Sequence, residues 1–243
     1  MTAYSKISDV PLFRYGFVMA DPPWAHERWS DKGSERAPDQ HYDTMTLSEI
    51  KSLPVGDLCG PHSLIWLWVP GCFVNVGEDV LNAWGAEFVT MGFWVKTQVH
   101  APHLPKIGTG YVLRECGEPF LIGKIGKPWV NDRGIPSVIM EPRREHSRKP
   151  EQGYALAERM APRGYDKLDL FSRQERQGWD CMGDEHDKFT NTARGCSQAD
   201  REKSSATCQN GEGWPNQSKR NRNRKDEVQS GKSGDSQSEF AFC

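Results

Sequence analysis

The chain has 243 residues, which is enough for one α/β domain with a sizeable core. Its 31 basic and 33 acidic residues leave a net charge of −2, so the charge of the whole chain does not indicate a polyanionic partner. The sequence has no run of about 18 apolar residues and no apolar signal segment at its start, so we expect a cytoplasmic protein without a membrane span. The seven cysteines form no C-x-x-C pair, which favours free thiols and gives no metal-site spacing.

Composition divides the chain near residue 186. The part before it holds the apolar runs and eight of the nine tryptophans. The part after it is rich in Ser, Gln, Asn, Gly and charge, and it cannot bury enough apolar surface to offset the entropy of ordering it. We therefore predict a folded domain over 1–186 and a disordered tail over 187–243.

In chain order, six short apolar runs predict strands: 17–20, 63–69, 87–95, 119–125, 137–140 and 167–171. Three stretches predict helices: 46–53, 72–85 and 149–164. Thr46 and Glu49 have the spacing of a capping box, and Gly85 is a typical stop signal for the second helix. This alternation predicts an α/β fold with a doubly wound sheet, whose ligands bind beyond the carboxyl ends of the strands.

The most informative stretch is "VMADPPW" (18–24), an acidic and aromatic tip directly after a predicted strand. The two prolines fix the backbone and carry no N–H, so Asp21 and the nearby carbonyl groups form a cluster of acceptors. Acceptors next to Trp24 suit a planar ring with an exocyclic amino group, and their hydrogen bonds would free its nitrogen lone pair to attack a methyl group. A proline-rich turn with a core tryptophan explains these residues equally well, because lone motifs are weak signals.

The sequence "ADPPW" (20–24) resembles the catalytic motif of the MT-A70 family of adenine-N6 methyltransferases. Four further blocks extend the resemblance in the same order: "HYDTMTLSEIKSLPVGDL" (41–58), "LIWLWVPGCFVNVGEDVLNAWGAEFVTMGFWVKT" (64–97), "GTGYVLRECGEPFLIGKIGKP" (108–128) and "HSRKPEQGYALAERMAPRGYDKLDLFSRQERQGWDCMGDE" (146–185). The resemblance implies a Rossmann-like sheet in permuted motif order, with the catalytic motif first and much of the cofactor-binding segment last. It also implies S-adenosylmethionine as the methyl donor.

The resemblance assigns the catalytic role to Asp21, Pro22, Pro23 and Trp24. Asp21 and the Pro22 carbonyl would accept hydrogen bonds from the adenine amino group, with Asp21 acting as an orienting acceptor more than as a base. Pro23 would stiffen the loop and Trp24 would form a wall for the base, although Trp24 also fits a core position. A base in such a site must leave its stack, so we expect flipped or unpaired adenine as the substrate.

The same resemblance implies six cofactor-binding residues: Lys96, Asp169, Phe171, Arg173, Asp184 and Glu185. Lys96 would meet the cofactor carboxylate, and Asp169 the ribose hydroxyls. Strand alternation predicts that Asp169 and Phe171 share one side of their strand. Asp184 stands where the family usually has an asparagine, and an ionised carboxylate cannot donate hydrogen bonds as an amide does. The alternatives are a solvated strand-end position for Lys96 and a surface ion pair for Arg173.

Four residues are expected to contact the substrate: Trp24, Tyr42, Arg148 and Lys149. Arg148 and Lys149 would serve either the nucleic-acid backbone or the cofactor, with a solvated helix start as the alternative. The polar stretch 25–40 is expected to be a loop over the site. We expect DNA more than RNA as the partner, and a dimer with a second copy or a different subunit. RNA methylation and a non-catalytic nucleic-acid-binding subunit are the alternatives.

Overall fold

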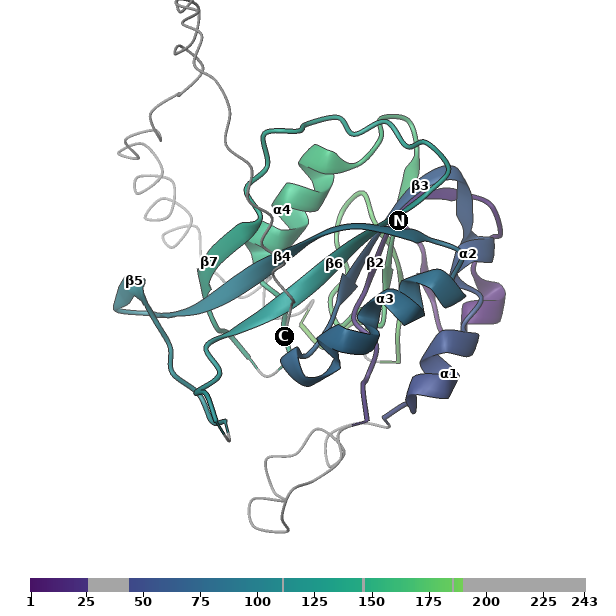
Figure 1. The fold of residues 1–243 in the computed structure, drawn as a ribbon. Helices are drawn as coiled ribbons and strands as arrows, with labels where there is room; N and C mark the ends of the chain where they lie inside the picture. Colours follow the sequence, from purple (N-terminus) through teal and green to yellow (C-terminus); the bar gives the residue numbers. More distant parts are fainter. Residues whose placement is uncertain (26–43, 111, 146, 185, 190–243) are drawn as a thin grey trace, which may run out of the picture. The chain divides into compact units, whose positions relative to one another are not determined.

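The computed structural model describes residues 1–25, 44–110, 112–145, 147–184 and 186–189 (Figure 1). All of these residues belong to one compact unit, Met1–Gly195. The predicted tail lies outside the described residues except for 187–189, and so does the predicted loop 25–40 except for Ala25.

The described strands are β1 (Ala3–Tyr4), β2 (Tyr15–Ala20), β3 (Cys59–Trp68), β4 (Glu87–Gln98), β5 (Ala101–Pro105), β6 (Gly117–Ile125), β7 (Val138–Pro142), β8 (Asp166–Leu170) and β9 (Asp180–Met182). The described helices are α1 (Leu47–Ser52), α2 (Val55–Leu58), α3 (Val74–Ala83) and α4 (Glu151–Met160), with short 3-10 turns η1 (Ile7–Asp9) and η4 (Gly71–Phe73). All six predicted strands and all three predicted helices are present, whereas β1, β5, β9 and α2 were not predicted. No helix among the described residues is long and apolar enough to span a membrane.

Within the described part of the chain, the nine strands form one mixed sheet in the order β1-β9-β8-β2-β3-β6-β4-β5, with β7 also paired to β4. The strand that precedes Asp21, β2, lies between β8 and β3 and runs parallel to both. β6 runs antiparallel to β3 and to β4, so the sheet is not purely parallel. The predicted α/β class with a Rossmann-like sheet is confirmed, and the Asp21–Trp24 motif directly follows an early central strand.

Helices cover both faces of this sheet, which makes it doubly wound (Figure 1). One apolar cluster packs α1, α2 and α3 against residues such as Val18 and Ala20 of β2. The other packs Leu156 and Ala157 of α4 against the opposite face, which includes Met19. Because every residue of β2 is buried, the strand is fixed from both faces and ends at a defined point.

Local sequence explains where two helices begin or end. The Glu49 N–H donates to the Thr46 hydroxyl at 3.3 Å and the Thr46 N–H donates to the Glu49 carboxylate at 2.7 Å, so the predicted capping box is confirmed. α3 ends before Gly85, whose φ of 77° is the left-handed conformation that glycine adopts without strain. These signals depend only on neighbouring residues, which is why they were readable from the sequence.

Candidate active site

The loop from Asp21 to Ala25 follows the carboxyl end of β2 and is held by backbone hydrogen bonds. The Asp21 N–H donates to Leu170 O at 3.4 Å, and the Trp24 N–H donates to Pro22 O at 2.9 Å. Pro23 O accepts from the Met45 N–H at 2.7 Å. The Pro22 carbonyl, predicted to bind the substrate, therefore already accepts one bond and has one further lone pair.

The structure places Trp24 in the core, which is the alternative that the sequence left open beside a wall for the base. Its side chain is 4% exposed, and its ring stacks on Phe73 with centroids 5.3 Å apart. Its Nε1–H donates to Trp68 O at 3.2 Å. An apolar ring with a polar edge satisfies the requirements of a core position as well as those of a binding wall, so the sequence did not separate the two roles.

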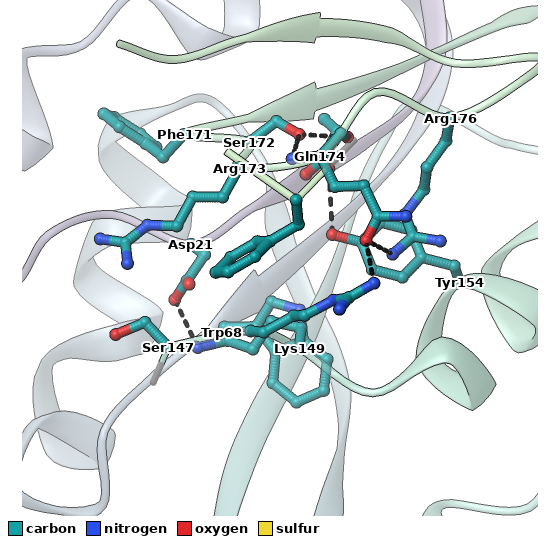
Figure 2. Close-up of a pocket in the computed structure, with 13 residues that line it drawn as sticks. Asp21, Trp68, Ser147, Lys149, Tyr154, Phe171, Ser172, Arg173, Gln174 and Arg176 are labelled. Atoms are coloured by element: carbon teal, nitrogen blue, oxygen red, sulfur yellow. Dashed lines mark hydrogen bonds and ion pairs between the residues drawn. The ribbon is translucent and has the colours of Figure 1, made fainter. Parts of the chain in front are cut away.

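Four charged residues form a line of alternating sign beside this loop. Lys149 Nζ lies 2.8 Å from Asp21 Oδ1 and 2.8 Å from Glu118 Oε1. Lys96 Nζ lies 3.1 Å from Glu118 Oε2. Figure 2 shows the Asp21 carboxylate and the Lys149 ammonium facing each other. Opposite charges thus alternate from Asp21, in the loop after β2, to Lys96 in β4.

These contacts explain the pKa directions in the line. Burial raises the pKa of Asp21 and Glu118 adds to that rise, while the Lys149 ammonium opposes it. Burial also acts to raise the pKa of Glu118, but the ammonium groups of Lys149 and Lys96 outweigh it and the pKa is lowered. Burial acts to lower the pKa of Lys149, and the two carboxylates reverse this into a rise.

Lys149 and Arg148, predicted to serve either the nucleic-acid backbone or the cofactor, are largely buried and paired within the protein. The Lys149 side chain is 9% exposed, and its ammonium also lies over the Trp68 ring at 5.5 Å. Arg148 is held by Glu145 at 3.0 Å and donates to Gln174 Oε1 at 2.7 Å. The residue that follows, Pro150, is the N-cap of α4, so the start of this helix fixes both side chains.

Asp169 lies at the carboxyl end of β8, beside the end of β2. Its register partner in β2 is Met19, its side chain is 3% exposed, and Oδ2 accepts from the Tyr154 hydroxyl at 3.0 Å. Burial raises the pKa of Asp169 to about 6, against the opposing hydrogen bonds of Ser172 and Tyr154. A buried carboxylate at this edge suits hydroxyl donors of a ligand.

Phe171 does not share a side with Asp169, which corrects the alternation argument. β8 ends at Leu170, and Phe171 has a φ of 63°, so its side chain turns to the apolar cluster that contains Leu168 and Leu170. The next residue approaches β9 closely: a Cβ on Gly183 would lie 2.4 Å from Ser172 O. Side chains alternate between the two faces of a strand only while the backbone stays extended. A single residue in the left-handed conformation ends this alternation.

One cavity connects these groups. Its lining residues are Asp21, Trp68, Ser147, Arg148, Lys149, Tyr154, Asp169, Phe171, Ser172, Arg173, Gln174, Arg176 and Phe189. The Arg173 guanidinium points toward the Asp21 carboxylate in Figure 2 and acts to lower the pKa of Asp21. The free space in the cavity is about 20 Å³, room for about one water molecule.

The predicted site residues divide into three groups. Asp21, Lys149, Asp169 and Arg173 line the same cavity, together with Arg148 and Phe171. Lys96 does not line it but reaches Lys149 through Glu118. Asp184 is exposed and is not a lining residue, whereas Tyr42 and Glu185 lie outside the described residues.

Sequence reasoning assigned no role to Glu118, Tyr154, Arg176 or Phe189. Two features of the sequence could have identified Glu118 as a site residue. It is a charged residue next to the apolar run of β6, and it belongs to one of the family blocks. Tyr154 lies in the stretch 149–164, for which the sequence predicted only a helix. Among the described residues, no group of three His, Cys, Asp or Glu side chains is placed to hold a metal ion.

Comparison with known proteins identifies the family. A family model described as MT-A70 matches residues 15–185. A putative N(6)-adenosine-methyltransferase MT-A70-like protein of Medicago truncatula is 36% identical over 176 residues, which are 72% of this chain and 27% of that protein. The N(6)-adenosine-methyltransferase catalytic subunit METTL3 of Homo sapiens is 32% identical over 179 residues, or 72% and 29% of the two chains. The type II methyltransferase M.MunI of a Mycoplasma species is 27% identical over 195 residues, or 72% and 78%.

The mixed doubly wound sheet, with its acidic and proline-bearing loop at the carboxyl edge, is consistent with an α/β fold of the methyltransferase type. The family match covers more than half of the sequence, so the chain belongs to the MT-A70 family. The chain spans about a quarter of the length of the plant relative and most of the length of the Mycoplasma relative.

Proposed function

We propose that this protein transfers a methyl group from S-adenosylmethionine to the exocyclic N6 of adenine in DNA. The observation that carries the proposal is the Asp21 carboxylate, which lines a cavity together with Asp169 and Arg173 at the carboxyl edge of the sheet. Membership of the MT-A70 family supports the same reaction. The substrate adenine would be flipped out of its stack or unpaired, because the amino group must reach Asp21.

The lining of the cavity fits the cofactor by its chemistry. Asp169 offers a buried carboxylate for ribose hydroxyls, and Arg173 offers a guanidinium for the carboxylate of the methionine part. Phe171 and Ser172 form the turn that links Asp169, near the end of β8, to Arg173. The cofactor, when bound, supplies a methyl group on a sulfonium and therefore an electrophile that needs no further activation.

The residues of the chain orient the amino group and receive its proton. Lys149 binds Oδ1 of Asp21, and Oδ2 is the second acceptor of the same carboxylate. The ammonium of Lys149 opposes the rise that burial causes in the pKa of Asp21 and so favours the ionised acceptor. Hydrogen bonds from the amino group to this carboxylate would raise the electron density on the adenine nitrogen. Once the methyl group is attached, the cationic nitrogen would release one proton to Asp21 Oδ2 and from there to solvent.

The choice of DNA rests on a relative of similar length. The Mycoplasma type II methyltransferase matches over 78% of its length, whereas the plant and human relatives match over less than a third. The names of those longer relatives, N(6)-adenosine-methyltransferases, favour RNA as the second candidate substrate. The intact Asp21–Trp24 motif argues against a non-catalytic subunit.

The test is incubation of the purified protein with labelled S-adenosylmethionine and with matched single-stranded and duplex DNA and RNA. We expect label in N6-methyladenine of the DNA. Label in RNA alone would assign the RNA substrate, and label in neither, with cofactor binding retained, would support a non-catalytic nucleic-acid-binding subunit.

A further inference from the structure

Tyr154 is a partly buried tyrosine with no assigned role, and its hydroxyl contacts the carboxylate expected to bind the cofactor. Its hydroxyl donates to Asp169 Oδ2 at 3.0 Å. Its ring is held from two sides, because the guanidinium carbon of Arg176 lies 3.6 Å from the ring centroid and Trp179 packs edge-on at 5.7 Å. Arg176 in turn forms a two-pronged ion pair with Glu151. The hydroxyl therefore has a fixed place relative to Asp169.

We propose that Tyr154 is a positioning residue, which holds the Asp169 carboxylate ionised and oriented toward the ligand. The proposal rests on the proposed function, in which Asp169 receives the ribose hydroxyls. The charged or titratable groups that act on Asp169 come from several elements: Tyr154 of α4, Asp21 after β2, Arg176 of the loop before β9, and Cys181 of β9. Among these, the Tyr154 hydroxyl donates a hydrogen bond that favours the charged form.

The test is Tyr154→Phe, which removes only the hydroxyl. S-adenosylhomocysteine binding is measured by calorimetry between pH 5 and pH 8.5. The wild-type affinity should fall as pH drops through about 6, and in the variant this fall should begin about one pH unit higher. At pH 8.5 the two proteins should bind alike.

Two outcomes overturn the role of Tyr154. A loss of affinity that is equal at every pH would show a merely structural contribution, and identical profiles would show no contribution. Absence of binding by the wild-type protein would instead overturn the cofactor assignment itself. The matched control is Tyr165→Phe, because Tyr165 is 43% exposed and does not line the cavity.

A second inference comes from the volume of the cavity and the position of Phe189. Ligand pockets for drug-sized molecules measure about 300–1,000 Å³, whereas this cavity has about 20 Å³ of free space. Phe189 is 8% exposed but belongs to neither apolar core cluster. Its N–H donates to Arg173 O at 3.1 Å, and its ring lies 5.1 Å from the guanidinium carbon of Arg148.

Phe189 is held less firmly than the charged residues at the centre of the cavity lining. Lys149, Asp21 and Asp169 are held by ion pairs or by a central strand, whereas Phe189 follows the last described strand, β9. We infer that the Phe189 ring is an internal plug, which must leave before the cofactor binds. A protein that spends part of its time closed binds with an affinity reduced by the open fraction.

The experiment compares S-adenosylhomocysteine binding by the wild-type protein, Phe189→Ala and the matched control Phe13→Ala, whose side chain is 70% exposed. Phe189→Ala should bind about tenfold more tightly or better, and Phe13→Ala should match the wild type. Weaker binding by Phe189→Ala would make the ring a wall for the ligand and overturn the plug, as would equal binding. Absence of binding by all three proteins would overturn the cofactor assignment.

A second readout follows the ring position directly. In Phe189→Cys, alkylation of residue 189 by iodoacetamide is quantified by peptide mass spectrometry. A plug predicts slow alkylation without ligand and faster alkylation with S-adenosylhomocysteine, because the segment moves out. Protection by the ligand would contradict it, since a wall residue becomes covered.

Discussion

Lys149 Nζ contacts Asp21 Oδ1 at 2.8 Å, although the two residues lie far apart in the sequence. The contact joins the loop after β2 to the residue before the N-cap of α4, and Glu118 of β6 binds the same ammonium. The acidic centre of the proposed active site is thus neutralised from within the protein. The charge state of Asp21 depends on a buried cation, and this relationship leads to the first two predictions.

Asp21→Asn should lower methyl transfer by at least about 10²-fold, a loss typical of removing one aligned electrostatic contact. The Asn oxygen will face the Lys149 ammonium, which leaves an amide NH₂ toward the adenine amino group. Single-turnover assays measure the transfer, and calorimetry with S-adenosylhomocysteine should show largely unchanged cofactor binding. Normal turnover in this variant would refute the role of Asp21.

Lys149→Met should destabilise the fold by about 3 kcal/mol, because it leaves two carboxylates close together without their cation. Denaturant unfolding at pH 7.5 gives the free energy of unfolding. Adding Glu118→Gln in the same chain should restore part of the loss, since it removes one of the two unpaired charges. Equal stability of Lys149→Met and the wild type would show that the pair contributes nothing.

Stability should depend on pH through Asp169. The unfolded pKa of an aspartate is about 3.9, and burial raises the folded pKa to about 6. The folded state holds this proton more tightly, so the contribution of Asp169 is fully present below pH 4 and is lost as pH rises through 6. Asp169→Asn should therefore be more stable than the wild type by about 2 kcal/mol at pH 7.5 and by much less at pH 4.5. A stability difference that is the same at both pH values would contradict the raised pKa.

Substitutions at Trp24 distinguish a role of its ring in the core from a contact with the substrate base. Trp24→Phe removes the bond to Trp68 O and should cost about 1 kcal/mol, while the KM for nucleic acid stays unchanged. Trp24→Ala should cost about 3–5 kcal/mol through the cavity it creates. If Trp24→Phe is as stable as the wild type but raises KM, the ring contacts the base after all.

The parts of the site that were predictable from the sequence are those set by neighbouring residues. The prolines placed Asp21 at a strand end, and the capping box placed the start of α1. Lys149 was singled out by its sequence block, but its contact with Asp21 depends on how β2, β6 and the start of α4 come together in space. Ion pairs of this kind depend on how distant segments of the chain pack together, which a local sequence pattern does not encode.

One error and one open choice have local physical causes. Phe171 was assigned to the wrong side because one left-handed residue ended the alternation of β8. The sequence left Trp24 between two roles, because a tryptophan fits a core and a binding wall by the same properties. Phe189 gave no sequence signal, because it stands in a polar stretch read as tail.

The central claim is that Asp21 serves adenine N6 methylation of DNA. Its most direct test is the mapping of N6-methyladenine in DNA from cells that express the wild-type protein or Asp21→Asn at matched levels. The account predicts N6-methyladenine at defined sequence positions with the wild-type protein and background levels with the variant. Equal methylation by both proteins, or DNA without added N6-methyladenine in the presence of the folded wild-type protein, would contradict it.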